Sequence, residues 1–199
     1  MITYMDDCIL ILAFQIERVN NNIRLGDYMQ EHIFKPLGIN KLAFQLANRP
    51  DLASSLTQLY DCDKHGTLFP VDDQLWPTWG SLDDLGGGGL YGTIEDYAKI
   101  QAALLRNNGT LLRADTVESM FQPQLSDPKY LANWVKHLPG LDRKVLLQTI
   151  PDNTELNFGF GGIMNVNNIP NGRGSRSLSW HGAWNATWVS CSLLTHVDY

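Results

Sequence analysis

Cysteine is scarce in this chain of 199 residues, and its three copies lie far apart. Cys8, Cys62 and Cys191 are odd in number, so they form no disulfide framework, and they lack the close Cys/His spacing of a zinc site. Cysteine usage of this kind favours a reducing compartment. We therefore expect a cytoplasmic protein without structural disulfides and without a structural metal.

Basic clusters and long apolar runs are also missing. The sequence has 15 Lys and Arg residues against 21 Asp and Glu residues, a net charge of −6, and it has no Lys/Arg run. Nucleic acid and anionic membrane surfaces are therefore not expected as partners. The longest apolar run, Cys8 to Phe14, is too short to span a bilayer. We expect no membrane association.

The overall composition is that of a globular protein. With 44% hydrophobic and 18% charged residues, the chain can bury a sizeable core, and we expect a single domain over residues 1–199. Apolar periodicity and breaker residues predict helices over 8–19, 27–34 and 113–121. They predict strands over 157–165 and 185–194.

A run of four glycines, residues 86–89, introduces the best-marked helix of the sequence. Glycine loses the most backbone entropy on folding, so the run indicates a close backbone approach or a positive φ. Thr93 is a predicted helix cap, with Asp96 three residues later as a variant of the capping box. Asn107-Asn108-Gly109 is the predicted end. The predicted apolar face consists of Ile94, Tyr97, Ala98, Gln101, Ala102, Leu104 and Leu105.

Two metal- or nucleotide-binding patterns are matched only in part. Gly87-x-Gly89-x-x-Gly92 fits the dinucleotide-binding fingerprint, but residues 76–84 do not read as the buried strand that must precede it. Asp61-x-Asp63-x-His65-Gly66 begins like a calcium loop, yet the twelfth position is Asp72 instead of glutamate. A hairpin turn explains this second segment better. We expect no calcium and no other cofactor.

Several short motifs together resemble one known family. They are Glu17-Arg18-Val19, Pro36-Leu37-Gly38-Ile39, the run 87–93 followed by Asp96-Tyr97-Ala98, and the segment 177–184. The sequence resembles the serine β-lactamase-like superfamily in its esterase and transesterase branch. That branch is similar to class C β-lactamases and penicillin-binding proteins, and it includes fungal acyltransferases. The resemblance implies an α+β fold of the β-lactamase/transpeptidase type, an antiparallel sheet flanked by helices.

The resemblance also assigns a candidate catalytic tyrosine. Counting back from Glu17 by the family spacing reaches Tyr4, and Asp6 stands where the family's Tyr-x-Asn motif has its asparagine. In such enzymes the phenol carries a proton for a serine nucleophile. Tyr4 is therefore a candidate catalytic residue and Asp6 a candidate substrate-binding residue. The alternative for Tyr4 is an ordinary packing role.

The third motif of the family is matched near the end of the sequence. Trp180-His181-Gly182-Ala183 stands where β-lactamases have Lys-Thr-Gly and the esterase branch often has Trp-x-Gly. The resemblance implies that the Ala183 amide donates to the oxyanion and that Gly182 lets the strand pass close to a substrate. His181 is either a polar wall of the acyl pocket or a satisfied strand histidine. Trp180 is assigned to the pocket lining rather than to the core.

The family's nucleophile motif, Ser-x-x-Lys, occurs only as Ser126 to Lys129. The family places this motif before its tyrosine motif, so we interpret Ser126 as the cap of a helix over 127–137. We expect the nucleophile segment and a C-terminal helix to be absent from this sequence. The predicted function is acyl transfer from an ester, thioester or amide, on a small-molecule acyl substrate, by a catalytically incomplete chain. The alternative is a non-catalytic remnant that binds an acyl ligand or a partner protein. The oligomeric state stays open.

Overall fold

The computed structural model describes residues 3–71, 83–147, 150–182 and 187–190. The chain divides into two compact units, Met1–Ile100 and Gln101–Tyr199, so that helix α4 runs from one into the other. In the part of the chain that the model describes, no helix is both long enough and apolar enough to cross a membrane.

The first unit is mainly helical, with short two-stranded pairings. Its elements are α1 (Thr3–Val19), α2 (Leu25–Met29), the π-helical turn η1 (Gln30–Phe34), β1 (Leu42–Ala43), the 3-10 turn η2 (Leu46–Asn48), α3 (Pro50–Ala53), β2 (Tyr60–Cys62), β3 (Leu68–Pro70), β4 (Tyr91–Gly92) and the first part of α4 (Ile94–Arg106). The predicted helix over 8–19 is confirmed and begins earlier, at Thr3. The predicted helix over 27–34 is split, because α2 passes directly into the wider turn of η1.

Two apolar clusters hold the first unit together. One joins α1 to α2, with Ala13 packed near Leu25 and Phe44. The other is formed by Phe34, Ile39 and Leu42 around the end of η1. Gly38 takes a φ of +62° there, which glycine adopts without strain and which reverses the chain toward β1.

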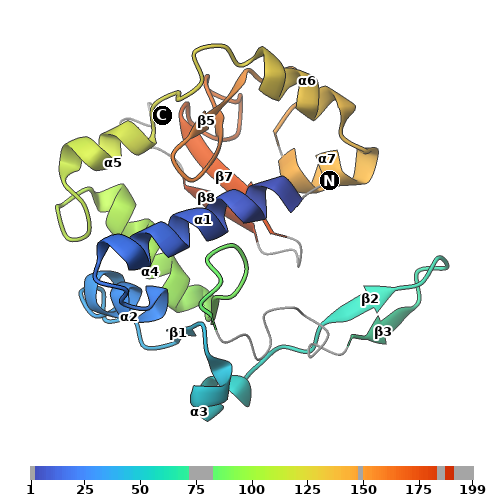
Figure 1. Cartoon of the computed structure of the whole chain (residues 1–199). Helices are drawn as coiled ribbons and strands as arrows, with labels where there is room; N and C mark the ends of the chain where they lie inside the picture. Colours follow the sequence, from blue (N-terminus) through green and yellow to red (C-terminus); the bar gives the residue numbers. More distant parts are fainter. Residues whose placement is uncertain (1–2, 72–82, 148–149, 183–186, 191–199) are drawn as a thin grey trace. The chain divides into compact units, whose positions relative to one another are not determined.

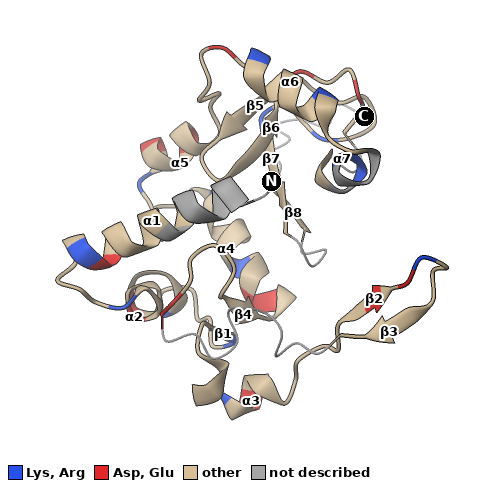
Figure 2. Ribbon diagram, turned by 45° about the vertical axis from the view of Figure 1, so that its right-hand side comes forward, with Lys and Arg blue, Asp and Glu red and all other residues tan. Residues whose placement is uncertain are grey.

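Strands β2 and β3 form a hairpin that extends away from the helices of its unit (Figure 1). In the turn, the Asp63 carboxylate accepts the backbone N–H of His65 at 2.8 Å and of Thr67 at 2.9 Å, while Gly66 has a φ of +82°. The predicted hairpin turn is therefore confirmed. Figure 2 shows that the charged residues of the hairpin lie on β2 and at its tip.

The second unit combines helices with one antiparallel sheet. Besides the end of α4 it contains α5 (Ala114–Met120), α6 (Lys129–His137), α7 (Gly140–Leu147), β5 (Leu156–Gly159), β6 (Gly162–Asn165), β7 (Ser177–His181) and β8 (Thr187–Ser190). The sheet has the order β5-β6-β7-β8, with α6 against β5 and α7 against β7 (Figure 1). Helices around an antiparallel sheet give the predicted α+β architecture.

The predicted single strand over 157–165 is wrong. The segment is a hairpin, because β5 ends at Gly159 and β6 begins at Gly162 after a two-residue turn. Gly161 has a φ of +109°, a backbone conformation that side chains disfavour, and it reverses the chain. Close backbone approach, the other part of the prediction, is confirmed at Gly162. A Cβ there would lie 2.7 Å from the carbonyl oxygen of Ser179.

One face of the sheet packs on the apolar core of the second unit. That core consists of Leu131, Val135, Leu147, Ile150 and Ile169. Leu156 and Phe158 of β5 pack against it. Because side chains alternate between the faces of a strand, the same face includes His181, whereas Trp180 belongs to the opposite face.

Candidate active site

The predicted third motif lies at the end of β7. Trp180 and His181 are the last two residues of that strand, and Gly182 follows it directly. All three are partly buried. Ala183, the predicted oxyanion-hole donor, lies outside the described residues, so its role stays a prediction.

His181 has a polar partner on the neighbouring strand. Its Nδ1 lies 2.7 Å from Oγ1 of Thr187, the residue directly opposite in the β7–β8 register. A threonine hydroxyl can donate or accept in this contact. A cross-strand hydrogen bond therefore satisfies one of the two ring nitrogens, as expected for a satisfied strand histidine, and the role of His181 as a pocket wall stays a prediction.

Trp180 lies opposite Trp188 in the same register. The two indoles belong to the sheet face that also includes Gly162. The Trp188 ring reaches that glycine, where its Cη2 would lie 3.0 Å from an added Cβ. The Trp188 ring therefore extends from β8 across β7 to β6, where Gly162 has no side chain that would obstruct it. Sequence analysis missed both Thr187 and Trp188, although a tight hairpin after Gly182 would have placed them opposite the predicted motif.

Tyr4 and Asp6 lie in the first turns of α1. They belong to the first unit, whereas Trp180, His181 and Gly182 belong to the second. The catalytic role of Tyr4 and the substrate-binding role of Asp6 stay predictions.

Gly86 of the glycine run, and Gly92 shortly after it, lie close to other segments of the first unit. A Cβ on Gly86 would lie 2.9 Å from the Cβ of Ala13 on α1. A Cβ on Gly92 would collide with the Leu42 side chain and lie 2.9 Å from the carbonyl oxygen of Lys41. Gly86, Gly89 and Gly92 have no positive φ. Of the two reasons predicted for these glycines, close approach is therefore the one that applies.

A buried carboxylate, Asp84, anchors the segment that leads into this run. Asp84 is 6% exposed and accepts hydrogen bonds from Arg24 Nη2 at 2.8 Å, Gly26 N at 2.9 Å and Gln45 Nε2 at 3.0 Å. Burial alone would raise the pKa of Asp84, but the bonds from Arg24, Gln45 and Gly26 outweigh it and lower the pKa. The glycine run therefore starts from a fixed point against α2.

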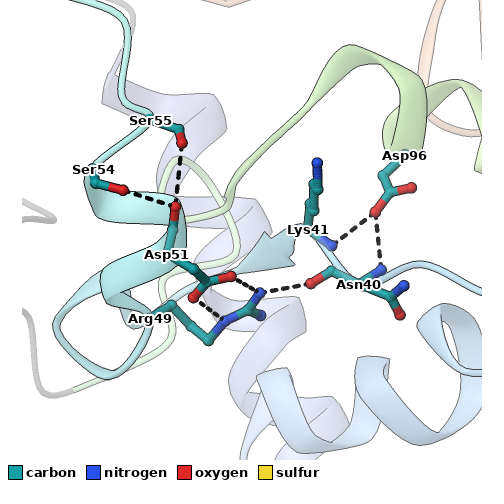
Figure 3. A network of polar contacts seen from close by, with 7 residues as sticks. All are labelled: Asn40, Lys41, Arg49, Asp51, Ser54, Ser55 and Asp96. Carbon is teal, nitrogen blue, oxygen red and sulfur yellow. Dashed lines mark hydrogen bonds and ion pairs between the residues drawn. The ribbon is translucent and has the colours of Figure 1, made fainter.

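A second buried carboxylate fixes the start of α4. Asp96 Oδ2 accepts the backbone N–H of Asn40 at 2.9 Å and of Lys41 at 2.7 Å (Figure 3). Its Oδ1 pairs with the Lys99 ammonium at 2.6 Å. The Lys99 contact and the two backbone donors lower the pKa of Asp96 to about 2, against the opposing effect of burial. Only half of the predicted capping box is present. Thr93 Oγ1 accepts from Asp96 N at 3.4 Å, but Thr93 N donates to the carbonyl of Lys41 instead.

The backbone carbonyl of Asn40, whose N–H is bonded to Asp96, is also hydrogen-bonded. Arg49 Nη2 donates to the Asn40 carbonyl oxygen at 2.8 Å and to Asp51 Oδ2 at 2.7 Å (Figure 3). Ser54 and Ser55 donate their hydroxyls to the Asp51 carbonyl oxygen. The segment that leads into β1 is therefore tied to both α3 and α4.

The predicted apolar face of α4 is wrong in its first turns. Ile94 is 85% exposed and Tyr97 is 37% exposed, whereas Ala103, left out of the prediction, is 7% exposed. The bonds of Asp96 turn that residue inward at the start of the helix, which moves Ile94 and Tyr97 outward. The predicted end of the helix is confirmed by positive φ at Asn107 and Gly109.

Ser126 does not cap α6 as predicted. The helix begins at Lys129, and the Asp127 carboxylate accepts its backbone N–H at 3.1 Å. The Lys129 ammonium pairs with Asp127 and lies 5.0 Å from the centre of the Tyr130 ring. The lysine of this Ser-x-x-Lys therefore forms an ion pair with Asp127 at the start of α6 instead of activating the Ser126 hydroxyl. Within the described ranges, no group of three or more His, Cys, Asp or Glu side chains could hold a metal ion.

Comparison with known proteins places these features in context. A family model described as Beta-lactamase matches residues 5–189. ML-236A carboxylate methylbutanoyltransferase from Penicillium citrinum is 31% identical over 175 residues, which cover 87% of this chain and 41% of that protein. Lovastatin esterase from Penicillium rubens is 31% identical over 178 residues, covering 87% and 43%.

Solved structures agree with these sequence matches. Unliganded simvastatin synthase (LovD) from Aspergillus terreus superposes with a TM-score of 0.80 at 28% identity. The match covers 90% of this chain and 44% of that one. The chain thus spans less than half the length of the relatives that it matches.

Proposed function

Because this chain belongs to the Beta-lactamase family, we propose that it supplies part of an acyl-transfer site of the esterase and transesterase kind. The resemblance seen in the sequence is confirmed, and so is the α+β fold of the β-lactamase/transpeptidase type. Since the chain spans 41% to 43% of two curated relatives, the activity and the substrate are proposals.

The names of the relatives support an acyl ester as the substrate class. One is a methylbutanoyltransferase and another is an esterase. Transfer and hydrolysis share a first step, in which an enzyme nucleophile takes the acyl group. They differ in whether an acceptor hydroxyl or water removes it. We therefore propose a small-molecule acyl ester, thioester or amide as substrate.

The proposed roles follow the family pattern. A serine oxygen attacks the acyl carbon and forms an ester with it, while the serine proton passes through the Tyr4 phenol to the leaving group. The Ala183 amide stabilises the negative charge on the carbonyl oxygen. Asp6, Trp180, His181 and Gly182 contact the substrate.

The 199-residue chain is proposed to be catalytically incomplete by itself. Its single Ser-x-x-Lys begins at Ser126, and Lys129 pairs with Asp127. An exposed serine without a neighbouring base is a weak nucleophile. The second candidate function is therefore a remnant that binds an acyl ligand or a partner without turning it over.

The decisive experiment is intact-mass measurement of the purified chain after incubation with a fluorophosphonate, followed by mapping of any modified residue. Circular dichroism establishes that the sample is folded, and Ser126→Ala serves as the matched control. We expect no stoichiometric adduct on either protein. A stoichiometric serine adduct on the parent chain would refute the incompleteness.

Titration with p-nitrophenyl butanoate tests the acyl site itself. Saturable binding that weakens in Trp180→Ala supports an acyl site. Turnover of the ester by the chain alone contradicts the incompleteness. A folded chain that shows neither binding nor an adduct overturns the proposed acyl site.

A further inference from the structure

The last pair of the β7–β8 ladder joins a histidine to a hydroxyl. His181 and Thr187 stand directly opposite each other, and their side chains lie on one face of the sheet with Nδ1 and Oγ1 2.7 Å apart. Threonine is branched at Cβ, so few rotamers are open to it in a strand. The hydroxyl is therefore a well-defined partner for the ring.

We propose that Thr187 is a positioning residue that fixes the tautomer of His181. In this arrangement the Thr187 hydroxyl donates to Nδ1. A neutral imidazole has a single N–H, so its proton then stays on Nε2. Thr187 thereby makes His181 a hydrogen-bond donor through Nε2.

The substrate chemistry favours this direction of the hydrogen bond. The inference rests on the proposed acyl site, because carbonyl and ester oxygens only accept hydrogen bonds. A wall residue that contacts an acyl group needs a donor, and Nε2–H supplies one. The cross-strand contact engages Nδ1, and the proposal assigns Nε2–H to the ligand.

The position of His181 also suits contact with a ligand. It is partly buried at the end of its strand, next to Gly182, which has no side chain. Trp180 lies on the other face of the sheet. The polar and aromatic members of the motif are therefore separated by the pleat, and His181 is the member of this motif that supplies a polar contact.

The test is long-range ¹H–¹⁵N NMR of the uniformly ¹⁵N-labelled full chain, with His181→Gln to assign the ring among five histidines. At a pH where the ring is neutral, we expect the Nε2–H tautomer for His181 in the parent chain and in Thr187→Ser. We expect a mixture of tautomers in Thr187→Val, which keeps the shape and the β-branching but lacks the hydroxyl. The Nδ1–H tautomer in the parent chain, or an unchanged tautomer in Thr187→Val, would overturn the positioning role.

Titration with p-nitrophenyl butanoate then tests the substrate contact. Loss of one hydrogen bond of ordinary strength weakens binding about fivefold, so we expect this loss in Thr187→Val and recovery in Thr187→Ser. Equal affinity in all three proteins would refute the contact between His181 and the acyl group. Absence of binding in the parent chain would overturn the proposed acyl site instead, and the tautomer measured without ligand would still decide the role of Thr187.

Discussion

Replacing Asp96 with asparagine removes a negative charge from the buried start of α4 while keeping the size of the side chain. The side chain of Asp96 is 9% exposed, and one of its oxygens accepts both backbone donors, from Asn40 and Lys41. An asparagine oxygen can retain these two bonds, so the substitution mainly removes the charge pairing with Lys99. The pKa of Asp96 is lowered from 3.8 to about 2. At 1.36 kcal/mol per unit, this corresponds to about 2 kcal/mol of folding stability.

The sign of the pH dependence follows from the lowered pKa. A carboxylate with a folded pKa below its unfolded value stabilises the protein when it is ionised in both states. The contribution of Asp96 is therefore complete above pH 4 and is lost as the pH falls from 3.8 toward 2. We expect the parent chain and Asp96→Asn to differ at pH 7 and to converge near pH 2.

Urea unfolding followed by circular dichroism measures this difference. Glu95→Gln is the matched control, because it neutralises an exposed carboxylate on the neighbouring position of the same helix, and it should change stability by less than about 0.5 kcal/mol.

Asp96→Ala also leaves two backbone N–H groups without their acceptor, so it should cost about 3 kcal/mol or more. Hydrogen exchange at Asn40 and Lys41 should accelerate in the alanine variant and stay slow in the asparagine variant. Equal stability of Asp96→Asn and the parent chain at pH 7 would refute this account of the site.

Two further substitutions test the second unit. Gly162→Ala should destabilise the fold by about 1 to 3 kcal/mol in urea unfolding, because the new methyl group meets the Trp188 ring and a backbone carbonyl oxygen. An unchanged unfolding midpoint would contradict the contact with Trp188. Asp127→Ala should lower the unfolding midpoint, because the backbone N–H of Lys129 loses its acceptor, whereas Ser126→Ala should leave the midpoint nearly unchanged. A larger loss in the serine variant would restore Ser126 as the cap.

Local chemistry was predictable from the sequence where a few adjacent residues decide the conformation. The hairpin turn at Asp63 to Gly66 needs only a short acceptor side chain and a residue that tolerates positive φ. The end of α4 at Asn107 follows from the same tolerance. The family motifs identified the fold in a similar way, because they are short and continuous.

Features that depend on distant segments were not predictable. The carboxylate of Asp96 bonds to backbone 55 and 56 residues away, and no local pattern distinguishes this from a capping box. The turn at Gly161 was not predicted, because glycine also occurs next to apolar residues in β5 and β6. The turn glycine therefore looks like part of one continuous strand. Conversely, Ser126 is a good cap residue by type, but the helix begins later, after Pro128, and the Asp127 carboxylate accepts the backbone N–H of Lys129.

The candidate site was predictable only as far as its linear motif. Trp180, His181 and Gly182 were found as consecutive letters, and the structure places them at the end of one strand. Their partners Thr187 and Trp188 are set by the strand register, which depends on the length of the connection and on the pairing of both strands. A motif search therefore recovers half of each cross-strand pair.

The pairing of β7 with β8 also limits how this protein can be redesigned. His181 meets Thr187 and Trp180 meets Trp188 in this register alone. A slip of β8 along β7 by one residue would bring an indole to the side of the imidazole, and a slip of two residues would restore the same faces with different partners. Loops grafted between Gly182 and Thr187 should therefore be judged by whether the strands keep this register, with retention of the histidine–hydroxyl pair as the criterion.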